Sequence, residues 1–109
     1  MSMTLGVTMV TWYVTLVIRS FRDRRTAALF QGRYVRSLDH RIIARARRKL
    51  QVIHAAQTLE ELGAVPGNRL EVLRGDRKGQ HSIRINDQWR ICLVWRDGEA
   101  HDVEFTDYH

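Results

Sequence analysis

The chain ends on three side chains that can move protons or contact a phosphate: Asp107, Tyr108 and His109. They directly follow Val103 to Thr106, which has the composition of a short strand. Histidine suits proton transfer because its pKa lies near neutrality, and tyrosine can stack on an unpaired base. A polar terminus is more often a plain tail than a site, so these residues alone leave both readings open.

A second candidate group is Arg90, in the segment WRICLVW. Apolar and other residues alternate there, as they do along a strand with one buried face. Asp97-Gly98 follows and is a strong hairpin signal. If the strands before and after this turn pair, the hairpin brings the end of the chain back beside Arg90.

Together these side chains fit the cleavage of RNA without a metal. In that reaction the 2′-hydroxyl attacks the adjacent phosphate, so one group must accept a proton and another must protonate the leaving 5′-oxygen. Cationic donors stabilise the charged phosphorane between these two steps. Arginine suits this last task because it binds phosphate through a flat, two-pronged set of donors.

The loop RGDRKG, which contains two glycines, adds Arg74, Arg77 and Lys78. A charge-rich loop of this kind is most often a solvated turn. The alternative is that these cations hold RNA phosphates.

The composition limits the classes of protein that fit. The length of 109 residues suits one domain, and the net charge of +6 favours a polyanionic partner. The single cysteine, Cys92, excludes an internal disulfide. The five histidines lack the spacing of a metal site, so neither a metal nor another cofactor is expected.

The first eighteen residues carry no charged side chain. They lack the basic start of a signal peptide, and their threonines and glycine fit a membrane span poorly, so no membrane association is expected. Tyr13 to Arg19 is predicted to form a first strand because it is rich in β-branched and aromatic residues. Residues 1–16 are interpreted as a leader or an extension of this strand, and residues 17–109 as the domain.

Two helices are predicted next. The first begins at Ser20 as N-cap, with Asp23 in its first turn, and stops at Gly32. The second covers Asp39 to Ala56, where one apolar stripe recurs at helical spacing. The stripe consists of Ile42, Ala46, Leu50 and Ile53.

After a loop marked by Gly63 and Pro66-Gly67, four segments read as strands: RLEVL, HSIRI, WRICLVW and HDVEF. Helices followed by hairpin-linked strands indicate an α+β fold with an antiparallel sheet.

The stretches VIRSFRDRRTAALFQG and RLEVLRGDRKGQHSIRINDQWRICLVW, with the terminal DYH, resemble the HigB-like branch of the RelE/ParE toxin superfamily. The likeness runs from Val17 to His109. It implies two N-terminal helices packed on a twisted antiparallel sheet. It further implies a cytoplasmic plasmid-maintenance toxin that cleaves mRNA on translating ribosomes. Its expected partner is a helix-turn-helix antitoxin similar to HigA, through which alone the toxin would contact operator DNA.

The resemblance also implies roles for particular residues. His109 would transfer protons, with Asp107 and Tyr108 as companions, and Arg90 would stabilise the phosphorane. Glu71 stands where some relatives carry a histidine, so the general base is either Glu71 or His109.

The basic loop receives a role in the same way. Arg74 matches a basic position of the family's site, and Arg77 and Lys78 would hold RNA phosphates. Two other functions remain alternatives to RNA cleavage. One is a ParE-like toxin that inhibits a protein target such as DNA gyrase without catalysis, and the other is a basic nucleic-acid-binding module.

Overall fold

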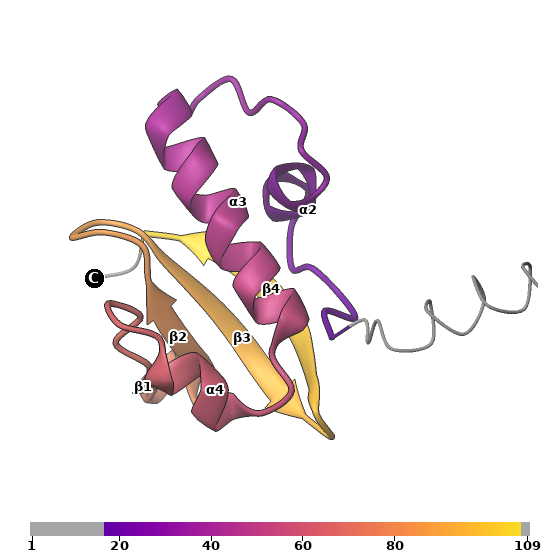
Figure 1. The fold of residues 1–109 in the computed structure, drawn as a ribbon, viewed down its shortest axis with the longest axis vertical. Coiled ribbons are helices and arrows are strands. Elements are labelled where there is room, and N and C mark those ends of the chain that lie inside the picture. Colours follow the sequence, from indigo (N-terminus) through magenta and orange to yellow (C-terminus); the bar gives the residue numbers. More distant parts are fainter. Residues whose placement is uncertain (1–16, 108–109) are drawn as a thin grey trace, which may run out of the picture.

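The computed structural model describes residues 17–107, which form three α-helices over a four-stranded antiparallel sheet (Figure 1). The order of strands in the sheet is β1-β2-β3-β4, the same as their order in the chain. The predicted α+β class is confirmed. The helices are α2 (Arg24–Phe30), α3 (His40–Ala55) and α4 (Leu59–Ala64), and the strands are β1 (Glu71–Val72), β2 (His81–Arg84), β3 (Arg90–Arg96) and β4 (Glu99–Thr106).

The predicted first strand is only partly described, because Tyr13 to Leu16 lie outside residues 17–107. Its described end runs parallel to β4 through two isolated bridges, Ile18↔Ala100 and Phe21↔Val103. The Ser20 hydroxyl accepts a hydrogen bond from the Asp102 backbone N–H (2.8 Å). This segment therefore covers part of the outer edge of β4.

Helix α2 begins later than predicted. Its N-cap is Asp23, whose carboxylate accepts from the Thr26 backbone N–H (2.8 Å). The prediction of Ser20 as the cap was wrong because Ser20 is bonded to β4 instead. Gly32, with φ of 80°, follows the helix as predicted and supplies the left-handed residue that commonly ends one.

Helix α3 confirms the second predicted helix, with Asp39 as its N-cap. Its buried positions are Ile43, Ala46, Leu50 and Ile53. The predicted stripe was therefore wrong at its first position: Ile43 is buried there, and Ile42 is only partly buried. In Figure 1, α3 crosses one face of the sheet with α2 beside it, and both helices contact β4.

Helix α4 was missed. The Thr58 hydroxyl accepts from the Glu61 backbone N–H (3.1 Å), and the Glu61 carboxylate accepts from the Gln57 backbone N–H (2.8 Å). This pair is close to a capping box, a signal already visible in the sequence TLEE. Leu62 is fully buried and attaches the short helix to the core.

Three core residues stand in register at the centre of the sheet. Ile83, Ile91 and Phe105 stand opposite one another on β2, β3 and β4, and all three are fully buried. The β3–β4 hairpin turns at Asp97 (φ 55°) and Gly98 (φ 74°), as a tight two-residue hairpin requires. The segment RLEVL forms only the two-residue β1, because Arg69 has a left-handed φ of 45° that interrupts the extended chain.

No helix within residues 17–107 combines the length and apolar character of a membrane span. Over the same residues, no three His, Cys, Asp or Glu side chains gather as a metal site would require.

His54 makes stability dependent on pH. Its Nδ1 accepts a hydrogen bond from the Ile18 backbone N–H (3.1 Å), which requires an unprotonated nitrogen. Burial lowers the pKa of His54 below its ordinary value of 6.5, so the folded chain takes up this proton less readily than the unfolded chain. The contribution of His54 is present above that value and is lost as the pH falls.

We therefore expect the melting temperature to fall between about pH 7.5 and about pH 5, and His54→Gln to flatten this decline. Thermal melts followed by circular dichroism test this. An unchanged pH slope in the variant would assign the effect to another group.

Candidate active site

The candidate site lies on the sheet face opposite the core side chains. Successive residues of a strand point to opposite faces. Because Ile91 and Phe105 point into the core, their neighbours Arg90 and Thr106 point the other way. Ser82 on β2 lies on the same face as Arg90.

Arg90 is held by several acceptors at once. Its Nε donates to the Ser82 hydroxyl (2.8 Å), and its Nη2 donates to the Arg69 carbonyl (2.7 Å). Nη2 also lies 3.1 Å from the Glu71 carboxylate. The Arg90 side chain is only 14% exposed. Its guanidinium therefore lies across β2 toward β1, in a fixed orientation.

A second guanidinium occupies the β4 side of the same face. Arg77 Nη1 lies 3.0 Å from the Glu104 carboxylate and donates to the Gln80 side chain (3.1 Å). Arg22 Nε lies 3.8 Å from Glu104. Since Glu104 is 17% exposed and Arg77 25%, this pair is largely shielded from water. The carboxylate thus holds Arg77 over the sheet.

Cys92 lies beneath these groups, and their charges affect the pKa of its thiol. Burial raises the pKa of its thiol to about 11; the charges of Arg77 and Arg90 oppose this rise, and that of Glu104 adds to it. Cys92 stands opposite both Ser82 and Glu104 in the sheet. The two guanidinium groups therefore lie over one face of the sheet, and each has a carboxylate beside it.

The end of β4 is fixed beside the start of β3. Thr106 pairs with Arg90, and the Phe105 ring stacks on Trp89 with a centroid separation of 4.4 Å. Helix α2 binds both backbone groups of Phe105. The Thr26 hydroxyl accepts from its N–H (2.9 Å), and Arg25 donates to its carbonyl (3.2 Å).

The predicted terminal residues follow this fixed point. Asp107 comes directly after Thr106, and its carboxylate accepts from the Gln88 side chain (3.0 Å). Tyr108 and His109 lie outside the described residues, so their assigned roles remain predictions.

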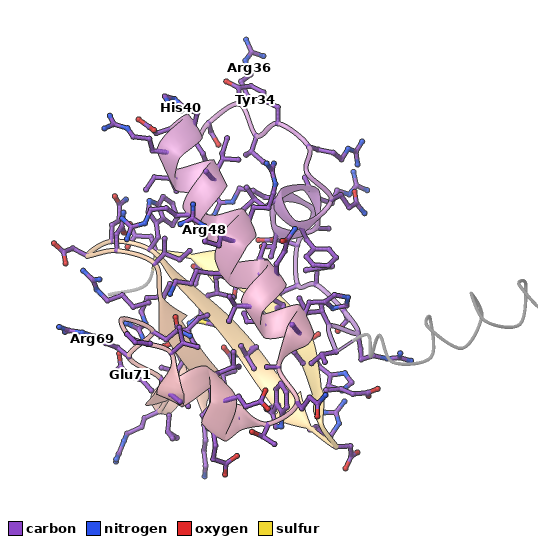
Figure 2. The ribbon with its side chains drawn as sticks, viewed as in Figure 1. Tyr34, Arg36, His40, Arg48, Arg69 and Glu71 are labelled. Atoms are coloured by element: carbon purple, nitrogen blue, oxygen red, sulfur yellow. The ribbon has the colours of Figure 1, made fainter. Side chains whose placement is uncertain are left out.

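The other predicted residues divide into two groups. The structure brings Arg90 and Glu71 into contact, and it places Arg77 on the same face. Arg74 and Lys78 are exposed around the single turn η1 (Gly75–Arg77). Figure 2 shows Glu71 and Arg69 next to each other at the sheet edge, far from Tyr34 and His40 at the start of α3.

Sequence reasoning missed several groups that contact the candidate residues. Among them are Ser82, Glu104, Gln80, Gln88 and the Arg69 carbonyl. Ser82 and Glu104 carried a weak signal, because each is a polar residue in an alternating strand. The role of the Arg69 carbonyl had no signal in the sequence, because its position depends on a left-handed backbone angle that the residue type does not predict.

The fold is similar to that of two solved structures. The chain is similar to the YoeB dimer from Staphylococcus aureus, with a TM-score of 0.54 and 22% identity, covering 87% of this chain and 98% of that one. It is also similar to the YoeB–YefM complex from Staphylococcus aureus, with a TM-score of 0.53 and 18% identity, covering 84% and 97%.

The sequence comparison is more specific. The family described as the RelE-like toxin of type II toxin–antitoxin system HigB matches residues 19–109, and the chain belongs to this family. It is 30% identical to Endoribonuclease HigB of Proteus vulgaris, over 85% of this chain and 100% of that one. It is 49% identical to Toxin HigB-1 of Vibrio cholerae over 53 residues, a match that spans 56% of that protein. The predicted family is confirmed.

The state of Cys92 can be tested directly. The thiolate is the reactive form of cysteine. With a pKa of about 11 and no exposed surface, Cys92 should react very slowly with a thiol reagent. At about pH 8 we expect labelling at least about a hundredfold slower in the folded chain than in denaturant. Absorbance of the released thiol chromophore measures this. Equal rates would show that the layer above Cys92 opens readily.

Proposed function

We propose that this protein is an endoribonuclease toxin that cleaves mRNA on the ribosome by metal-independent attack of the 2′-hydroxyl. Its membership of the HigB toxin family and its full-length match to Endoribonuclease HigB support RNA cleavage. The guanidinium groups of Arg90 and Arg77 on one sheet face supply charge of the sign that a phosphorane needs.

One observation carries the proposal: the β3–β4 register that pairs Arg90 with Thr106. Because β4 ends at Thr106, directly opposite Arg90, Asp107 is the first residue after the strand and lies next to the Arg90 position. In the proposed mechanism His109 transfers protons, Asp107 and Tyr108 orient it and contact the scissile region, and Arg90 stabilises the phosphorane. Arg74, Arg77 and Lys78 hold neighbouring RNA phosphates.

Glu71 has two possible roles in this mechanism. Its carboxylate lies 3.1 Å from Arg90 Nη2, and it is half exposed. As a base, it would accept the proton of the 2′-hydroxyl. As a partner of Arg90, it would orient the guanidinium and be displaced by the incoming phosphate. The ion pair favours the second role, and His109 is then the base.

The proposal includes an antitoxin partner. The Staphylococcus aureus neighbours include YoeB–YefM complexes. The exposed cations of α3, Arg41, Arg45 and Arg48, offer an acidic segment of an inhibitor a complementary surface. We propose a helix-turn-helix antitoxin similar to HigA, with operator DNA contacted only through it, and a cytoplasmic location.

The cleavage proposal is tested by primer extension on mRNA after expression in bacterial cells. His109→Ala should reduce cleavage by at least about a hundredfold, because a positioned proton-transfer group contributes that much. Arg90→Ala should reduce it by a similar amount through loss of phosphorane stabilisation, about 10²- to 10³-fold. His101→Ala is the matched control, since His101 lies on β4 beside Glu99 and away from Arg90.

Other outcomes identify the alternatives. Full toxicity of His109→Ala without any mRNA cleavage would favour inhibition of a protein target such as DNA gyrase. Strong, salt-dependent binding to nucleic acid without toxicity would favour a simple basic binding module.

Glu71 can be assigned by comparing two substitutions. Glu71→Gln removes the basic carboxylate but keeps an oxygen that can accept from Arg90. If Glu71 orients Arg90, cleavage by Glu71→Gln should stay within about tenfold of wild type; if it is the base, the loss should be about a hundredfold or more. Single-turnover cleavage rates decide between the two. Glu71→Ala should be the slower variant under the orienting role and equally slow under the basic role.

A further inference from the structure

Asn68 connects three elements around the approach to β1. It is fully buried although it is polar. Its side chain donates to the Leu62 carbonyl of α4 (3.0 Å) and accepts from the Lys49 ammonium of α3. Its backbone carbonyl accepts from the Arg84 N–H of β2 (2.6 Å), and its own N–H donates to the Val65 carbonyl (3.1 Å). Both its side chain and its peptide groups are therefore fixed, as the burial of polar groups requires.

The next residue, Arg69, has a backbone conformation that L-residues rarely adopt. Its φ is 45°, and it is not a glycine. A left-handed conformation is unfavourable for a residue that carries a side chain, so the surrounding structure must impose it. The fixed position of Asn68, directly before it, is the evident source of that constraint.

The unusual conformation has one clear result: the Arg69 carbonyl accepts a hydrogen bond from Arg90 Nη2 at 2.7 Å. The other neutral acceptors are both on Ser82: its hydroxyl accepts from Nε, and its carbonyl accepts from Nη2 (3.4 Å). None of these bonds depends on Glu71, so all can persist when a phosphate replaces that carboxylate. Within residues 17–107, Nη1 of Arg90 has no hydrogen-bond partner and is available to a phosphate oxygen.

We propose that the Asn68–Arg69 segment is a positioning element that uses the left-handed turn at Arg69 to hold the Arg90 guanidinium in its RNA-binding orientation. The kinetic part of this inference rests on the proposed RNA cleavage. In this role Asn68 and Arg69 act through the Arg90 guanidinium, which the Arg69 carbonyl holds in place.

The test is a pair of substitutions that both remove the Arg69 side chain. Glycine adopts a positive φ without strain, whereas the β-branched valine is strongly disfavoured there. We expect Arg69→Val to have a kcat at least about tenfold below that of Arg69→Gly, because displacement of a catalytic group by about 1 Å can cost about a hundredfold. The KM values of the two variants should differ by less than about threefold, since RNA binding is shared by many cations.

A second measurement does not require activity. The Arg90 Nε–H is bonded to Ser82, and its exchange with solvent can be followed by NMR in the full chain labelled with ¹⁵N-arginine. Exchange should be faster in Arg69→Val than in Arg69→Gly. Asp97, with φ of 55° in the β3–β4 hairpin, provides the control pair. There Gly and Val should differ in melting temperature but not in kcat or in Arg90 exchange.

The outcomes are distinguishable. Equal kcat and equal Arg90 exchange in the two Arg69 variants would overturn the positioning role. Failure of the wild-type protein to cleave RNA would overturn the proposed function, while the exchange comparison would still decide the positioning. If Arg69→Val does not fold, Arg69→Ala replaces it with the same expected order.

Discussion

The candidate site depends on the anchoring of Phe105 near the end of β4. The ring is fully buried and stacks on Trp89, and both backbone polar groups are bonded to α2. A shift of one residue in this strand would turn Phe105 to the opposite face and remove it from the core. The pairing of Arg90 with Thr106 follows from this anchoring. The core thus determines where the last residues of the chain leave the sheet.

The charged face shows how the protein holds two guanidinium groups on one side of the sheet. Arg90 is paired with Glu71, and Arg77 with Glu104. Each guanidinium also has a neutral acceptor, Ser82 for Arg90 and Gln80 for Arg77. Partly buried charges need such partners, because an isolated charge away from water is costly. A phosphate that displaces Glu71 would therefore meet a guanidinium that is already oriented.

Much of the fold was predictable because its signals are local. The helix that begins after Asp39, three of the four positions of its apolar stripe and the Asp97-Gly98 turn each depend on signals within a few residues, and each was confirmed. Two predictions were wrong because a contact with a residue distant in the sequence overrode the local signal. Ser20 lost its expected capping role to a bond with Asp102, and RLEVL was shortened because Asn68 is held by α3 and α4. Helix α4 was missed although its cap was visible in the sequence.

The sequence by itself determined the family, the α+β class and the residues able to do chemistry, because residue type, alternation and turn signals are properties of short segments. It also placed Arg90 beside the end of the last strand, since a tight hairpin leaves few ways for two adjacent strands to pair. Only the tertiary structure decided where the Arg90 guanidinium points. That direction depends on Ser82, Glu71 and the Arg69 carbonyl, which meet only when the sheet has formed. The Arg69 carbonyl in particular is placed by a backbone angle that buried contacts impose, and no residue type encodes it.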